Sequence, residues 1–134
     1  MRWILFRGID EGTEEWVYGY YCESTAQFHK GKEHSIFDDK TISKYSIIPE
    51  TVGQFTGLTD RNGKRIFEGD VVTGLFLFEL SVNAVVTFQD GAFGLEWYRG
   101  NVKTFNAFTS ICNVEYEVIG NVHDNPELLK GEGE

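Results

Sequence analysis

The sequence contains few prolines, methionines and cysteines, and its N-terminus lacks a long apolar segment. The two cysteines, Cys22 and Cys112, lie far apart, and a chain of 134 residues can bury enough apolar surface to fold without disulfides. The first residues are charged and aromatic, unlike the apolar centre of a signal peptide. We therefore expect a cytoplasmic protein with reduced thiols.

Positive charge is also scarce. The chain has 12 lysines and arginines against 21 aspartates and glutamates, a net charge of −9. This excess repels the phosphates of nucleic acids unless a local basic surface overrides it. The one basic cluster, Arg61, Lys64 and Arg65, could touch phosphates. Three cations at a turn more often form a solvated loop, so nucleic acid is the less favoured partner.

Aromatic residues and glycine are abundant, at 15% of the chain and 15 residues respectively. This mixture favours strands joined by turns over helices. The length fits one domain, residues 1–134. We predict a mainly β fold, a small barrel or sandwich-like arrangement of antiparallel sheets built from successive hairpins.

The central segment, residues 51–72, carries the strongest local signal. Asn62-Gly63 is a dipeptide of tight hairpin turns, in which both central residues take positive φ. Gly57 lies in the approaching strand, and Gly69-Asp70 predicts a second reversal or a bulge. We therefore assign these residues, with Asp60, to turn formation.

Further hairpins and turns are predicted on both sides of this segment. Residues 1–8 and 15–21 form a first hairpin, and residues 82–88 and 92–97 flank the Asp-Gly turn signal at Asp90. The last strand spans residues 112–122. A short helical turn follows, capped by Asn125 with Pro126 at its first position, and residues 131–134 should be frayed.

An aromatic row on the second strand places Trp16, Tyr18 and Tyr20 on one face. Such a row can stack on nucleic-acid bases, but without cationic neighbours it is more often one wall of a core. We favour the core.

Acidic residues of the central hairpin are the first candidates for chemistry. Asp60, Glu68 and Asp70 could act as acid and base or hold a divalent ion. The competing interpretation is that Asp60 and Asp70 accept backbone hydrogen bonds at the turns. We favour this structural role and expect no catalytic residues and no cofactor, because no histidine or nucleophile has a recognisable partner nearby.

A zinc site is the second candidate for chemistry, formed by Cys22, His29 and His34. Structural zinc sites usually contain paired ligands at short spacing, which these residues lack. We therefore expect no metal.

Four segments resemble the YopX family of phage and prophage proteins. They are ILFRG near the N-terminus, EWVYGYY, the central PETVGQFTGLTDRNGKRIFEGDVV and the final YEVIGNVHDNPELL, in the family's order. The central and final blocks are long and specific, whereas residues 22–48 and 80–110 carry little of the pattern. The resemblance implies a small, largely β protein encoded by a bacteriophage or prophage, and it leaves the mechanism open, with no catalytic residues to carry over.

Three functions are consistent with these observations. We favour a non-enzymatic accessory protein that self-associates and binds a host or phage protein, through an exposed strand edge or the apolar run Leu75, Phe76, Leu77 and Phe78. The second is an oligomer that binds or sequesters a small nucleotide-like ligand, with the blunting of host defence as one role, in pockets lined by Trp16, Trp97 and Tyr98. The third is a small-barrel module associated with nucleic acid.

Overall fold

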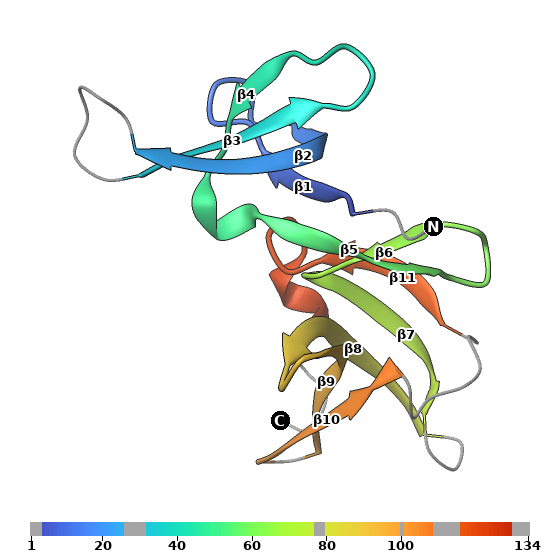
Figure 1. Ribbon diagram of the computed structural model, residues 1–134. Coiled ribbons are helices and arrows are strands. Elements are labelled where there is room, and N and C mark those ends of the chain that lie inside the picture. Colours follow the sequence, from blue (N-terminus) through green and yellow to red (C-terminus); the bar gives the residue numbers. More distant parts are fainter. Residues whose placement is uncertain (1–3, 26–31, 77–79, 100, 109–115, 130–134) are drawn as a thin grey trace. The chain divides into compact units, whose positions relative to one another are not determined.

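The computed structural model describes residues 4–25, 32–76, 80–99, 101–108 and 116–129 of the chain (Figure 1). Its strands are β1 (Phe6–Ile9), β2 (Trp16–Thr25), β3 (Lys32–Asp38), β4 (Lys44–Ser46), β5 (Gly53–Thr59), β6 (Arg65–Phe67), β7 (Asp70–Phe76), β8 (Leu80–Gln89), β9 (Ala92–Arg99), β10 (Val102–Ala107) and β11 (Glu117–Asn121). Two 3-10 turns, η1 (Pro49–Thr51) and η3 (Pro126–Leu129), are also present. The predicted frayed tail, residues 131–134, lies outside the described residues.

The predicted mainly β fold is confirmed. The strands form two antiparallel sheets, in the orders β4-β3-β2-β1-β5-β6 and β10-β9-β8-β7-β11. Among the described strands, neither sheet closes into a barrel. No helix in the described part of the chain is long and apolar enough to cross a membrane.

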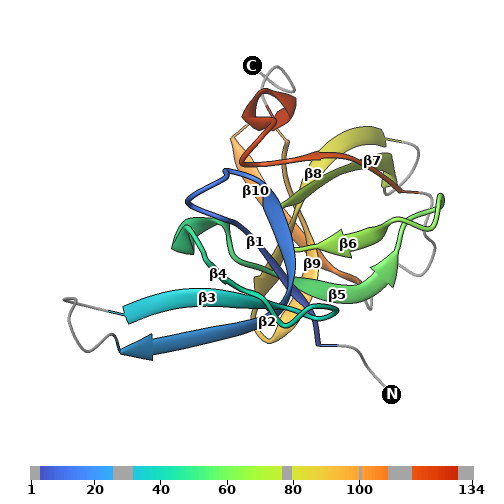
Figure 2. The same cartoon turned by 90° about the horizontal axis from the view of Figure 1, so that it is seen from above.

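The chain divides into two compact units, residues 1–55 and 56–134, with the boundary inside β5. In the first unit, β2 and β3 pair from Gly19↔Asp38 to Thr25↔Lys32 and appear as adjacent arrows in Figure 2. The single domain expected from the chain length stays a prediction.

Two hairpin loops of the first unit are built by the same device, an aspartate that begins the loop. The Asp10 carboxylate accepts hydrogen bonds from the backbone N–H and hydroxyl of Thr13, at 3.2 and 2.8 Å. The Asp38 carboxylate accepts from the N–H groups of Lys40 and Thr41, both at 2.8 Å. Each carboxylate thus satisfies loop backbone groups that no strand can pair.

The prediction that the aromatic row of β2 forms a core wall was wrong. Tyr18 is 42% exposed and Tyr20 is 59% exposed, while Trp16 is half-buried. Gly19, on the opposite face of the strand, is buried. Alternation therefore identified the two faces of β2 correctly, but the aromatic face is the one that solvent reaches.

The second unit contains a core that joins β6 to the second sheet. Its members are buried side chains on the inward faces of their strands: Ile66, Val72, Ala84, Val86, Leu95, Trp97, Tyr116 and Val118. The hairpin of β8 and β9 turns at Asp90 and Gly91, whose φ angles of 51° and 83° match the predicted Asp-Gly turn. This hairpin prediction is confirmed.

The central hairpin is present, but its turn begins at Asp60, one residue before the position that Asn62-Gly63 predicts. The Gly63 N–H donates to the Asp60 carbonyl oxygen at 2.9 Å, so Arg61 and Asn62 occupy the centre of the turn. Of the predicted pair, only Gly63 has positive φ, at 83°. The cause is the Asp60 carboxylate, which accepts the N–H groups of Asn62 and Lys64 and so favours a turn that starts at Asp60.

The predicted reversal at Gly69 is also present, between β6 and β7. Gly69 has a φ of 89°, as does Gly57 within β5. The Gly69 N–H donates to the Val86 carbonyl at 2.9 Å, and the Gly69 carbonyl accepts the Val122 N–H at 2.9 Å. This turn therefore links β8 to the segment that follows β11.

Candidate functional site

A cluster of polar contacts surrounds Asp60, in the turn between β5 and β6. One carboxylate oxygen, Oδ1, accepts the N–H groups of Asn62 and Lys64 at 2.8 and 2.9 Å. The other, Oδ2, accepts the N–H of Val118 in β11 at 2.9 Å. Asp60 is 5% exposed. A single buried carboxylate thus joins the turn to a strand 58 residues further along the chain.

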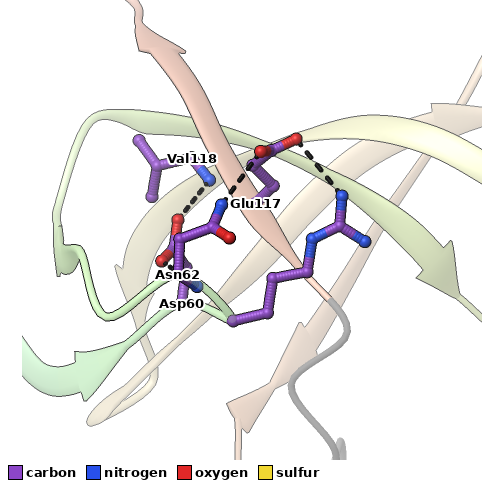
Figure 3. A network of polar contacts seen from close by, with 5 residues as sticks. Asp60, Asn62, Glu117 and Val118 are labelled. Carbon is purple, nitrogen blue, oxygen red and sulfur yellow. Dashed lines mark hydrogen bonds and ion pairs between the residues drawn. The ribbon is translucent and has the colours of Figure 1, made fainter.

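Glu117 joins the same two segments through a second set of contacts (Figure 3), which are exposed to solvent. Its Oε1 accepts Asn62 Nδ2–H at 2.9 Å, and its Oε2 lies 3.3 Å from Arg61 Nη2. The Arg61 N–H also donates to the Tyr116 carbonyl at 3.1 Å. We call Asp60, Arg61, Asn62, Glu117 and Val118 the Asp60 clasp.

The electrostatics of the clasp keep Asp60 charged. Burial alone raises the pKa of its carboxyl group, but the backbone hydrogen bonds from Val118, Lys64 and Asn62 lower it, and the resulting pKa is below the ordinary value for aspartate. An anion with both oxygens bonded to backbone amides is a poor proton carrier at neutral pH. The geometry therefore suits a structural role.

The other acidic candidates are placed at the next turn. The Asp70 carboxylate accepts the Phe67 N–H at 2.8 Å, and Asp70 is 2% exposed, whereas Glu68 is half-buried. The turn-forming roles predicted for Asp60 and Asp70 are those seen. Among the described residues, no three histidine, cysteine, aspartate or glutamate side chains gather as metal ligands would.

Of the three residues predicted to contact phosphates, Arg61 belongs to the Asp60 clasp, and Lys64 and Arg65 do not. Arg61 pairs with Glu117, as described above. Lys64 and Arg65 are exposed, and the N–H and carbonyl groups of Lys64 both bond to Asp60. Pairing with Glu117 offsets part of the positive charge that the sequence places at this turn.

The three residues of the predicted ligand pocket have different environments. Trp97 is 5% exposed and belongs to the core of the second unit, whereas Tyr98, on the opposite face of β9, is 55% exposed. Trp16 lies beside Arg7, whose guanidinium carbon is 4.6 Å from the ring centroid. Trp97 is therefore a packing residue, and the ligand-binding role of Trp16 and Tyr98 stays a prediction.

Of the three zinc candidates, His29 lies outside the described residues. His34 Nδ1 shares a hydrogen bond of 2.5 Å with the Tyr21 hydroxyl, and the two rings stack with centroids 5.9 Å apart. Burial, and then the charges of Glu23 and Cys22, raise the pKa of Tyr21. Cys22 itself is exposed.

The apolar run predicted as an association surface is described only in part. Leu75 and Phe76 form the end of β7 and pair with Ser81 and Leu80 of β8. Leu77 and Phe78 lie outside the described residues.

Comparison with known proteins assigns the chain to a family. The sequence model of the YopX protein family matches residues 5–130. The chain belongs to the YopX family. No protein with curated annotation matches it.

A solved structure supports the fold of this YopX protein. The crystal structure of protein EF1440 from Enterococcus faecalis shares 22% sequence identity, with a TM-score of 0.54. The match covers 97% of this chain and 100% of that one. At this identity the likeness concerns the fold alone.

The two long blocks that carry the YopX resemblance lie on the two sides of the Asp60 clasp. The central block contributes the turn from Asp60, and the final block contributes β11. Within the final block, Asn125 Oδ1 accepts the Asn121 N–H at 3.3 Å, and the Leu128 carbonyl of the same block accepts a hydrogen bond from Asn83 Nδ2–H of β8 at 2.8 Å. In this chain, these family residues therefore bond segments of the second unit together.

Sequence reasoning missed Glu117 and the bond from Val118 to Asp60. Glu117 alternates with apolar residues, as any solvent-facing strand residue does. No local pattern relates it to Asn62, which is 55 residues away.

Proposed function

We propose that this YopX protein is a non-enzymatic accessory protein of a bacteriophage or prophage. It acts in the cytoplasm of the bacterial host by self-associating and by binding a host or phage protein. The observation that carries the proposal is the exposed pair Tyr18 and Tyr20 on β2. Tyrosine is enriched at protein interfaces, because it offers a large rigid contact area with a polar end.

Three features of the first unit support a binding role for this face. Tyr18 and Tyr20 are neighbours on the same side of one strand, and Trp16 continues the row. Tyr18 pairs with Arg7 of β1, and Tyr20 pairs with Phe37 of β3. The tyrosines are thus fixed on paired strands, which limits the entropy lost when a partner binds.

The bonding of the acidic residues supports a non-enzymatic role. Both oxygens of Asp60 accept backbone hydrogen bonds, and one oxygen of Asp70 does so. A carboxylate used in this way holds the chain together and is not positioned to exchange protons with a substrate.

Affinity purification from the infected or lysogenic host, followed by mass spectrometry, tests the proposal. We expect the tagged wild type to retain a specific host or phage protein, and a Tyr18→Ser/Tyr20→Ser variant to lose it. Tyr98→Ser, which changes another exposed tyrosine, should retain it. Circular dichroism confirms that each variant folds. Failure of the wild type to enrich any protein, or equal retention by the double variant, would contradict the proposal.

A further inference from the structure

Among the described strands, four lie at the edges of the two sheets, and they differ in how their outer backbone groups are protected. An edge strand exposes unpaired N–H and C=O groups that can pair with another chain, and proteins usually blunt such edges. The edges of the first sheet, β4 and β6, are only three residues long. Short edges of this kind offer little template for pairing.

The β11 edge of the second sheet is covered by the Asp60 clasp. The Val118 N–H donates to Asp60, and the Tyr116 carbonyl accepts the Arg61 N–H. A shift of register after Val118 also interrupts the strand. Both are devices that prevent edge-to-edge pairing.

The opposite edge, β10, lacks such protection within the described chain. Its six residues, Val102–Ala107, pair with β9 over their whole length, and no described segment bonds their backbone on the other side. The strand contains no proline, and Val102 is 66% exposed. The one charged side chain, Lys103, forms an ion pair with Glu96 of β9 at 3.0 Å. The charge that would repel an incoming strand is therefore offset within the sheet.

We infer that β10 is the surface through which two copies of this chain associate, by antiparallel pairing of the two β10 strands about a two-fold axis. This inference rests on the self-association in the proposed function and names its site. Residues that lie opposite each other in an antiparallel pair point to the same face of the sheet. Two-fold symmetry therefore requires one residue, such as Thr104 or Phe105, to lie directly opposite its own copy in the other chain. In these registers Lys103 lies opposite Phe105 or Ala107, so the two lysines do not face each other. The strand is thus compatible with its own copy.

The interface is small, which sets the expected strength of the dimer. Pairing of two six-residue strands buries less than the roughly 1,000 Å² typical of stable interfaces, so the dimer should be weak and concentration-dependent. Each chain carries a charge of −9, and mutual repulsion should make association stronger at higher salt.

Sedimentation velocity of the full chain over a range of concentrations tests the inference. We expect a monomer–dimer equilibrium in the wild type, weakened at least tenfold by Val102→Lys, which adds a charge to the edge. Ile42→Lys is the matched control, because Ile42 is an apolar residue 75% exposed in the loop between β3 and β4. It should leave the dimer unchanged.

Hydrogen exchange locates the contact without a substitution. Amides of β10 should gain protection as the concentration rises, whereas amides of β11 should not change. A dimer that tolerates Val102→Lys and shows no added protection in β10 overturns the pairing of β10 and leaves self-association intact. A monomer at every concentration overturns both.

Discussion

Replacement of Asp60 by asparagine tests whether one carboxylate holds the turn of the central hairpin to β11. Asparagine keeps the size of the side chain and can still accept the N–H groups of Asn62 and Lys64 through its single oxygen. Its amide nitrogen would then replace Oδ2, the atom that accepts the Val118 N–H at 2.9 Å. Two donors would face each other at a buried position.

The magnitude follows from the lost bond. A hydrogen bond to a charged acceptor contributes about 1.5 to 3 kcal/mol, and a buried N–H left without a partner costs about 1 to 3 kcal/mol. These figures overlap, because they describe the same contact. We expect Asp60→Asn to lower the free energy of unfolding by about 2 to 3 kcal/mol.

Urea unfolding followed by circular dichroism measures the change, and hydrogen exchange of the Val118 amide measures the bond itself. Asp39→Asn is the matched control: Asp39 is exposed, so this variant should change stability by less than about 0.5 kcal/mol. The reasoning is refuted if Asp60→Asn is no more destabilising than Asp39→Asn, or if the Val118 amide exchanges at the wild-type rate.

The pH dependence gives a second measurement of the same interaction. Because the pKa of Asp60 is lowered in the folded protein, its contribution is fully present above the unfolded value, about 4, and is lost as the pH falls through the folded value. The stability difference between the wild type and Asp60→Asn should therefore shrink in acid. A difference independent of pH would show that the charge of Asp60 is not what stabilises the clasp.

Three further substitutions separate the parts of the second unit. Glu117→Gln should cost less than about 1 kcal/mol in urea unfolding, because its ion pair with Arg61 is exposed and glutamine can still accept from Asn62. Gly120→Ala should cost about 1 to 3 kcal/mol by the same assay, since the new Cβ would lie 2.5 Å from Asn125 Oδ1. Trp97→Ala should lower stability by about 3 to 5 kcal/mol, as expected for a buried aromatic residue; a loss below about 1 kcal/mol would contradict its place in the core.

The sequence by itself determined the features that depend on neighbours along the chain. The reversals at Asp90-Gly91 and Gly69 were predictable, because turn geometry is set by a few consecutive residues. The 3-10 turn after Asn125 was predictable for the same reason. The mainly β composition followed from the abundance of aromatic residues and glycine.

Only the tertiary structure decided which predicted surfaces are buried and which distant groups meet. Alternation shows that β2 has two faces, but the packing of other strands determines that Tyr18 and Tyr20 face solvent while Trp97 of β9 is buried. Asn62 and Gly63 do not form the centre of the turn, because the carboxylate of Asp60 accepts the N–H groups of Asn62 and Lys64 and favours a turn that begins at Asp60. The bond from Asp60 to Val118 has no signature in the sequence, since 58 residues separate its donor and acceptor and only folding brings them together.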